Sequence, residues 1–187
     1  MVKAAQYKSQ NKSMIRKCSD SEFTVIHEII NDAAVAYKCV IPADCFHEPY
    51  MSEDGLRHEV AKGIAFWGLE QGGELAGVMG IQDVQDVTLI RHAYVRTAQR
   101  NRGIGGELLS FLIGRTERPI LIGTWADAAW AVRFYQQRGF RLVPPAEKDP
   151  LLEKYWGVPQ RQMETSVVLA DWRWFERHEN GRLRNQE

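Results

Sequence analysis

The sequence predicts an α/β (α+β) fold built on a central mixed, mostly antiparallel twisted sheet of about seven strands. One observation is a hairpin: a Gln-Gly-Gly turn at 71–73 joins two apolar segments, and a third follows at once as a meander. Another is the passage from a strand through a glycine-rich turn into a helix at 92–115. The segments that read as strands are 14–18, 64–70, 75–84, 86–95, 120–124, 140–143 and 166–170.

Helical periodicity separates these strands. Four helices are expected. The first follows Ser19–Glu22 and runs to about Tyr37, and the others run from 52 to about 62, from 107 to about 115, and from 127 to 138. The first has N-cap candidates in Ser19–Glu22 and an apolar stripe that includes Ile26, Ile29 and Ile30. In the last, Trp130 and Phe134 lie on one stripe, and we expect both in the core.

The 187 residues suit a single domain with a full core. Residues 1–13 are polar, lack periodicity and read as a flexible leader, so the predicted domain is 14–187. Before the last strand, residues 144–165 form a polar insertion, which we expect to act as a substrate lid or a subunit contact. The aromatic residues after Asp171 predict a short terminal helix.

Bulk charge and cysteine usage exclude several classes of protein. Lysine plus arginine equals aspartate plus glutamate, 24 each, so we expect no nucleic-acid or membrane partner. Three cysteines without metal-ligand spacing argue against both a disulfide framework and a metal site. No segment resembles a signal peptide or a membrane span, which predicts a cytoplasmic protein.

The stretch from Arg100 to Gly106, RNRGIGG, has the character of a phosphate-binding turn. Backbone N–H groups at the positive end of the following helix, beside Arg100 and Arg102, bind phosphate. Glycine is needed where a Cβ would hold the phosphate oxygens away from the amides. A dinucleotide fingerprint would require glycine at Leu108, and the Gly-Lys-Ser/Thr of a nucleotide-binding P-loop is absent.

The pattern Arg100-x-x-Gly103-x-Gly105 resembles the Arg/Gln-x-x-Gly-x-Gly/Ala signature of the GNAT superfamily of N-acetyltransferases. About 30 residues on, Ala131-x-x-Phe134-Tyr135-x-x-x-Gly139-Phe140 matches a second pattern of that family. The resemblance spans roughly 14–170, and it implies helices on both faces of the sheet and acetyl-CoA as co-substrate.

By this resemblance, the turn binds the pyrophosphate of acetyl-CoA and the strand before it holds the pantetheine arm. Amides next to Val95 would also polarise the thioester carbonyl. Ala128 stands where the family often has an asparagine that contacts the cofactor. The cofactor-binding candidates are Tyr94, Val95, Arg96, Arg100, Asn101, Arg102, Gly103, Ile104, Gly105 and Gly106.

Acetyl transfer to an amine needs a group that stabilises the departing thiolate and a group that takes the proton of the amine. Tyr135 is our candidate for the first task, since a phenol of pKa about 10 can donate to a thiolate. His92 is the candidate base, because its intrinsic pKa suits the task. The glutamate that many family members carry would fall at Leu89. Other candidate bases are Asp83, Asp86, His47, Glu48, Asp127 and a relay of waters.

Candidate acceptor-site residues are His47 and Glu48 in the loop at 39–51, together with Trp125 and Asp127. The leading hypothesis is an N-acetyltransferase that acts on an amine of a small molecule or peptide. A homodimer is compatible with the family resemblance and with the aromatic C-terminal segment. An acyltransferase with another donor or acceptor remains open, as does a non-catalytic CoA-binding sensor or interaction module.

Overall fold

The computed structural model describes residues 13–184, so the predicted leader lies almost wholly outside the described part. These residues form one seven-stranded sheet in the order β1-β2-β3-β4-β5-β7-β6. Neighbouring strands are antiparallel except for β4 and β5, which are parallel. The predicted fold class is confirmed. The strands are β1 Met14–Lys17, β2 Ala65–Gln71, β3 Glu74–Val84, β4 Val87–Val95, β5 Ile120–Trp125, β6 Arg141–Leu142 and β7 Ser166–Ala170.

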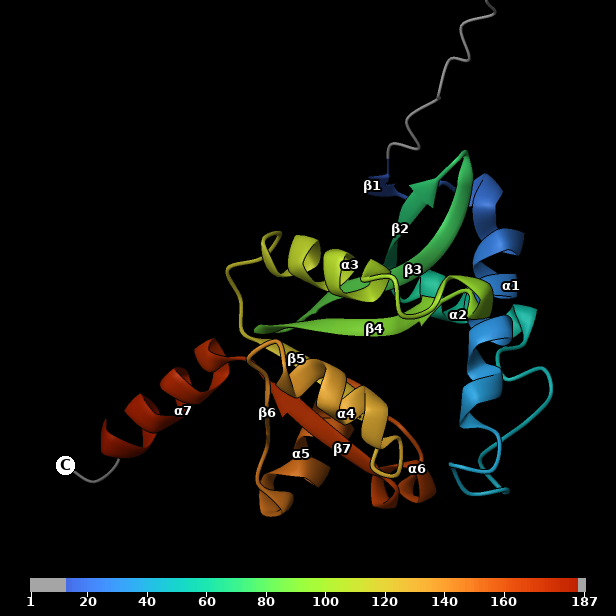
Figure 1. Cartoon of the computed structure of the whole chain (residues 1–187). Coiled ribbons are helices and arrows are strands. Elements are labelled where there is room, and N and C mark those ends of the chain that lie inside the picture. Colours follow the sequence, from blue (N-terminus) through green and yellow to red (C-terminus); the bar gives the residue numbers. More distant parts are fainter. Residues whose placement is uncertain (1–12, 185–187) are drawn as a thin grey trace, which may run out of the picture.

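Helices cover both faces of the sheet. On one face, α3 and α4 pack against residues such as Met79, Ile90 and Ile122. On the other face, α1 and α2 pack on Phe66 and Val78, while α5 and α7 pack on the half that contains β5 and β7. Figure 1 shows α1 in blue and α7 in red at opposite ends of the molecule. The helices are α1 Phe23–Ala34, α2 Glu53–Ala61, α3 Ile104–Ile113, α4 Ala129–Gln136, α5 Pro145–Tyr155, α6 Gln160–Glu164 and α7 Trp172–Arg184.

The parallel strands β4 and β5 are paired over a short stretch only. Thr88–Ile90 pair with Ile120–Ile122, and beyond Ile90 the pairing of β4 with β5 ends. On its other side β4 carries a bulge, because Gly80 pairs with Arg91 but Val78 pairs with Tyr94. The bulge contains His92, whose φ of +50° is unusual for a residue with a side chain. The end of β4 therefore has β3 on one edge and an opening on the other.

Three details differ from the sequence-based predictions. The helix after the glycine turn begins at Ile104, three residues before the predicted start. The insertion at 144–165 contains two helices, α5 and α6, although α5 includes Pro150. Trp130, predicted in the core, is 40% exposed, because its stripe of α4 faces a cleft instead of the sheet.

Candidate active site

The glycine-rich turn presents free backbone amides. Gly103, with φ of +85°, caps α3 in the left-handed region that favours glycine. The first hydrogen bond of the helix runs from the N–H of Glu107 to the carbonyl of Gly103, at 3.0 Å. The amides of residues 104–106 consequently lack intrahelical partners. A hypothetical Cβ on Gly106 would lie 2.6 Å from Nη2 of Arg138, so this guanidinium stands directly beside the free amides. Amides and guanidinium together suit a diphosphate.

A cleft of about 350 Å³, here called the α3–α4 cleft, starts at this turn. Arg100, Asn101 and Gly105 line it at one end, and Val95 lies on its strand side. The N–H of Arg96 donates to the carbonyl of Ala76 at 2.9 Å, so this amide faces β3. Because strand amides alternate between the two edges, the amide of Val95 faces the opening instead.

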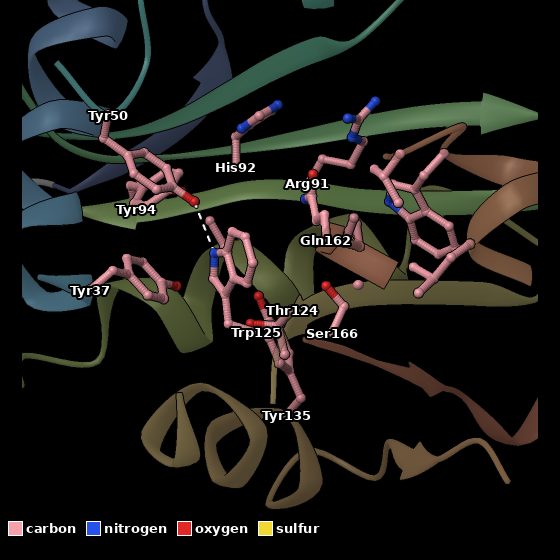
Figure 2. Close-up of a pocket in the computed structure, with 16 residues that line it drawn as sticks. Tyr37, Tyr50, Arg91, His92, Tyr94, Thr124, Trp125, Tyr135, Gln162 and Ser166 are labelled. Carbon is pink, nitrogen blue, oxygen red and sulfur yellow. Dashed lines mark hydrogen bonds between the residues drawn. The ribbon is translucent and has the colours of Figure 1, made fainter. Parts of the chain in front are cut away.

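A narrow passage of about 140 Å³ continues from this cleft through the opening between β4 and β5. The cleft and the passage share four residues: Tyr37, Ala93, Tyr94 and Tyr135. In Figure 2, Tyr135 and His92 lie on opposite sides of the passage, with Thr124 and Trp125 between them.

Two phenols face the passage from different helices. Tyr135 of α4 is 7% exposed and packs edge-on against Phe134 and Phe140. Burial raises the pKa of Tyr135, the phenol of Tyr37 raises it further, and Arg138 opposes the shift. Burial likewise raises the pKa of Tyr37 to about 12. Both side chains are therefore protonated, hydrogen-bond-donating phenols at neutral pH.

On the opposite side of the sheet opening lies a groove of about 550 Å³, here called the acceptor groove. Its walls come from α2, from the loop before it and from residues 156–162 of the insertion. The passage and the acceptor groove share Tyr50, His92, Trp125 and Trp156, among others. The three cavities thus adjoin one another at these shared residues.

The carboxylate of Glu59 in α2 contacts the side chains of two consecutive residues at the bulge, Arg91 and His92. Its Oε2 lies 2.6 Å from Nη2 of Arg91 and 3.0 Å from Nε2 of His92. Burial alone would raise the pKa of Glu59, but the hydrogen bond with His92 and the charge of Arg91 hold the pKa below its usual range. Since Nε2 of His92 is taken by this carboxylate, Nδ1 is the nitrogen left to accept a proton.

The predicted acceptor residues divide into two groups. His47 and Trp125 line the acceptor groove. Glu48 is instead exposed and paired with Lys38 at 2.7 Å, and Asp127 lies in the exposed turn before α4. Among the cofactor candidates, the side chain of Ile104 is buried in the core, so this residue offers its amide alone.

Two of the alternative bases lie near the other end of β4. Asp83 accepts a hydrogen bond from Thr88 at 2.6 Å. Asp86 accepts one from Tyr155 at 2.8 Å and lies 3.6 Å from Lys154. Both carboxylates therefore have partners of their own, outside the cavities.

Sequence reasoning missed Tyr37, Glu59 and Arg138. Tyr37 ends a 3-10 helix, Glu59 lies on α2, and Arg138 lies in the turn just after α4. Their spacing marks only ordinary positions, and each reaches the site through tertiary packing. The spacing of Arg138, four residues after Phe134, does explain its hydrogen bond to the carbonyl of Phe134 and its place over that ring, 3.9 Å from the centroid.

Comparison with known families decides the assignment. The family model for the acetyltransferase (GNAT) domain matches residues 14–150, most of the chain. The chain belongs to the GNAT acetyltransferase family. No curated protein shows significant sequence similarity to it. The assignment identifies the protein as an acyltransferase and confirms the resemblance seen in its motifs.

Solved structures share the GNAT fold. A GNAT-family acetyltransferase from Staphylococcus aureus has a TM-score of 0.64 at 18% identity, covering 86% of this chain and 98% of that one. The PaiA N-acetyltransferase from Thermoplasma acidophilum, in complex with coenzyme A, scores 0.63 at 14% identity, with 86% and 98% covered. YncA from Salmonella typhimurium, with its cofactor acetyl-CoA, scores 0.56 at 21% identity, with 71% and 82% covered. At these identities the likeness shows the fold alone.

Within residues 13–184, no helix has the length and apolar character needed to cross a bilayer. The same part of the chain holds no group of three or more His, Cys, Asp or Glu side chains arranged to bind a metal ion.

Proposed function

We propose that the protein is an acetyl-CoA-dependent N-acetyltransferase that transfers the acetyl group directly to an amine of a small molecule or peptide. The observation that carries this proposal is the succession of three adjoining cavities at the opening between β4 and β5. Direct transfer needs donor and acceptor in contact, and the passage is where they would meet.

The α3–α4 cleft suits acetyl-CoA. Its diphosphate would lie against the amides of residues 104–106, with Arg100 and Arg138 as cationic partners. Arg102, directly before Gly103, is a further candidate from the sequence. The pantetheine arm would then run along the end of β4, where the amide of Val95 faces the opening. This amide would also donate a hydrogen bond to the thioester oxygen as negative charge develops on it.

In the reaction, the amine nitrogen forms a bond to the thioester carbon, and the carbon–sulfur bond breaks. His92, oriented by Glu59, would take the proton of the amine through Nδ1 and pass it to solvent. Tyr135 would hydrogen-bond the leaving sulfur. Because the pKa of Tyr135 is raised, its phenol is a weaker acid than a thiol of pKa about 8.5. Its expected role is therefore to stabilise the thiolate by a hydrogen bond without giving up its proton.

Thiol release from acetyl-CoA over a panel of amines tests the proposal. A hydrogen bond to a charged group contributes about 1.5–3 kcal/mol, so Tyr135→Phe should lower kcat about 10- to 150-fold. The Kd for CoA should not change, because the hydroxyl acts on the thiolate alone. Tyr155→Phe is a matched control, since Tyr155 is also buried but packs in the cluster around α5.

The outcomes separate the proposal from its alternatives. CoA binding without turnover of any amine would favour the non-catalytic sensor. Turnover only with a hydroxyl acceptor or another acyl-CoA would favour a different acyltransferase. A cytoplasmic location, the absence of nucleic-acid and membrane partners, and a homodimer remain predictions from the sequence.

A further inference from the structure

We propose that the acceptor is an arylalkylamine, which is a primary amine joined by a short alkyl linker to an aromatic ring, without a second cationic centre. Such compounds are called aromatic amines below. This inference rests on the proposed function, because it names the molecule whose nitrogen attacks the thioester. Two independent features of the acceptor groove carry it, namely its aromatic wall and its balance of charges.

One part of the aromatic wall is held in place by its own contacts. Tyr50 stacks on Tyr37, with ring centroids 5.9 Å apart and ring planes 11° apart. Its hydroxyl accepts a hydrogen bond from Nε1 of Trp125 at 3.1 Å, the contact drawn as a dashed line in Figure 2. These rings come from distant parts of the chain, and their mutual contacts fix the wall before a ligand arrives. A preorganised wall lowers the entropic cost of binding.

Trp156 of the insertion supplies the facing part of the wall. A hypothetical Cβ on Gly123 would lie 3.3 Å from Cε2 of this indole, so the glycine in β5 lets the indole approach the strand closely. Trp125 and Trp156 line both the passage and the groove. Aromatic rings gain from contact with other rings beyond the burial of area. A flat ring joined to the reacting amine would be in reach of both indoles while its nitrogen lies near His92.

The charges of the acceptor groove disfavour a polycation. Within the described part of the chain, the carboxylates that line it are those of Asp44 and Glu59. Nε of Arg161 lies 2.8 Å from Asp44, and Glu59 is held by Arg91 at 2.6 Å. Lys62 adds a third cationic side chain to the groove, and its charge also lowers the pKa of Glu59. A polyamine or an aminoglycoside would bring extra ammonium groups to carboxylates that already have cationic partners.

The size of the groove agrees with this choice. A volume of about 550 Å³ lies within the range of small-ligand sites. An amine attacks as the neutral species, so the reacting nitrogen itself needs no carboxylate to pair with.

The test is a comparison of kcat/KM for 2-phenylethylamine, tryptamine, hexylamine and spermidine with the full chain and acetyl-CoA. The aromatic amines should exceed hexylamine by about tenfold, the ratio expected from one good aromatic contact. Spermidine should be the poorest of the four. Hexylamine equal to the aromatic amines, or spermidine above them, overturns the inference and leaves the proposed function standing. Absence of turnover with every amine overturns both.

Two variants make the test specific. Trp156→Leu should abolish the tenfold advantage of the aromatic amines while CoA affinity, measured by calorimetry, stays unchanged. Arg161→Ala removes an exposed side chain and leaves Asp44 unpaired, so kcat/KM for spermidine should rise severalfold. Arg57→Ala is the matched control, because this exposed arginine is paired with Glu53 outside the groove. An aromatic advantage that persists in Trp156→Leu, or an equal response of spermidine to both arginine variants, contradicts the inference.

Discussion

Replacing Glu59 by glutamine probes both the stability and the chemistry of the site. One oxygen of Glu59 serves Arg91 at 2.6 Å and His92 at 3.0 Å, and all three side chains are at most 15% exposed. Removing one partner of a buried ion pair costs about 3–5 kcal/mol, since it leaves the other charge uncompensated. Glutamine keeps a carbonyl oxygen that can accept from Arg91, so we expect a cost near the lower end, about 3 kcal/mol. For a chain of this size that lowers Tm by about 6–12 °C.

The same substitution should lower kcat. Without the carboxylate, His92 loses the hydrogen-bond partner that fixes the orientation of its ring. The Kd for CoA should stay unchanged, because Glu59 lines the acceptor groove and not the α3–α4 cleft. Thermal unfolding followed by circular dichroism gives Tm, and thiol release gives kcat.

Glu53→Gln is the matched control on the same helix. Glu53 is 64% exposed and pairs with Arg57 at 3.3 Å, an arrangement worth less than about 1 kcal/mol. Equal changes in Tm for the two variants would show that the pair in the bulge contributes no more than a surface pair. An unchanged kcat in Glu59→Gln would remove Glu59 from the mechanism.

Three more predictions follow from single residues. Gly103→Ala places a side chain at φ of +85°, so it should cost about 1–2 kcal/mol and weaken CoA binding; an unaltered Tm would contradict this strain. Hydrogen bonds from Arg16 and from a backbone amide hold the pKa of Glu22 at about 2, below the 4.5 of an ordinary glutamate. The stability that Glu22 contributes is therefore present above pH 4.5 and is lost as the pH falls towards 2. Over this pH range, the free energy of unfolding measured in urea should depend less on pH in Glu22→Gln than in the unsubstituted protein. Gly123→Val should displace Trp156 and raise KM for the acceptor with CoA affinity unchanged, whereas a normal KM would mean that the indole does not shape the groove.

The sequence predicted most of the fold because its signals are local. The Gly72-Gly73 turn fixed the β2–β3 hairpin, and the last strand was placed at its observed residues, 166–170. Trp130 shows the limit of periodicity, since a helical stripe indicates a shared face but not what covers that face. The helix α5 was missed because Pro150 argues against a helix interior, and tertiary packing of Leu151, Leu152 and Tyr155 overrides this.

The site was predictable where its residues are adjacent in the chain. Spacing alone singled out the turn at 100–106, and the second motif singled out Tyr135. Glu59 could not be found in this way, because its role depends on a bulge that turns His92 towards α2. The opening between β4 and β5 depends on how many residues of the two strands are paired with each other, and the sequence of neither strand determines that number by itself.

A crystal structure with bound acetyl-CoA is the most direct test of the proposed site. The diphosphate should contact the amides of residues 104–106, and the thioester should lie in the passage within hydrogen-bonding distance of Tyr135. A diphosphate bound elsewhere, or a thioester outside the passage between Tyr135 and His92, would contradict the proposed mechanism.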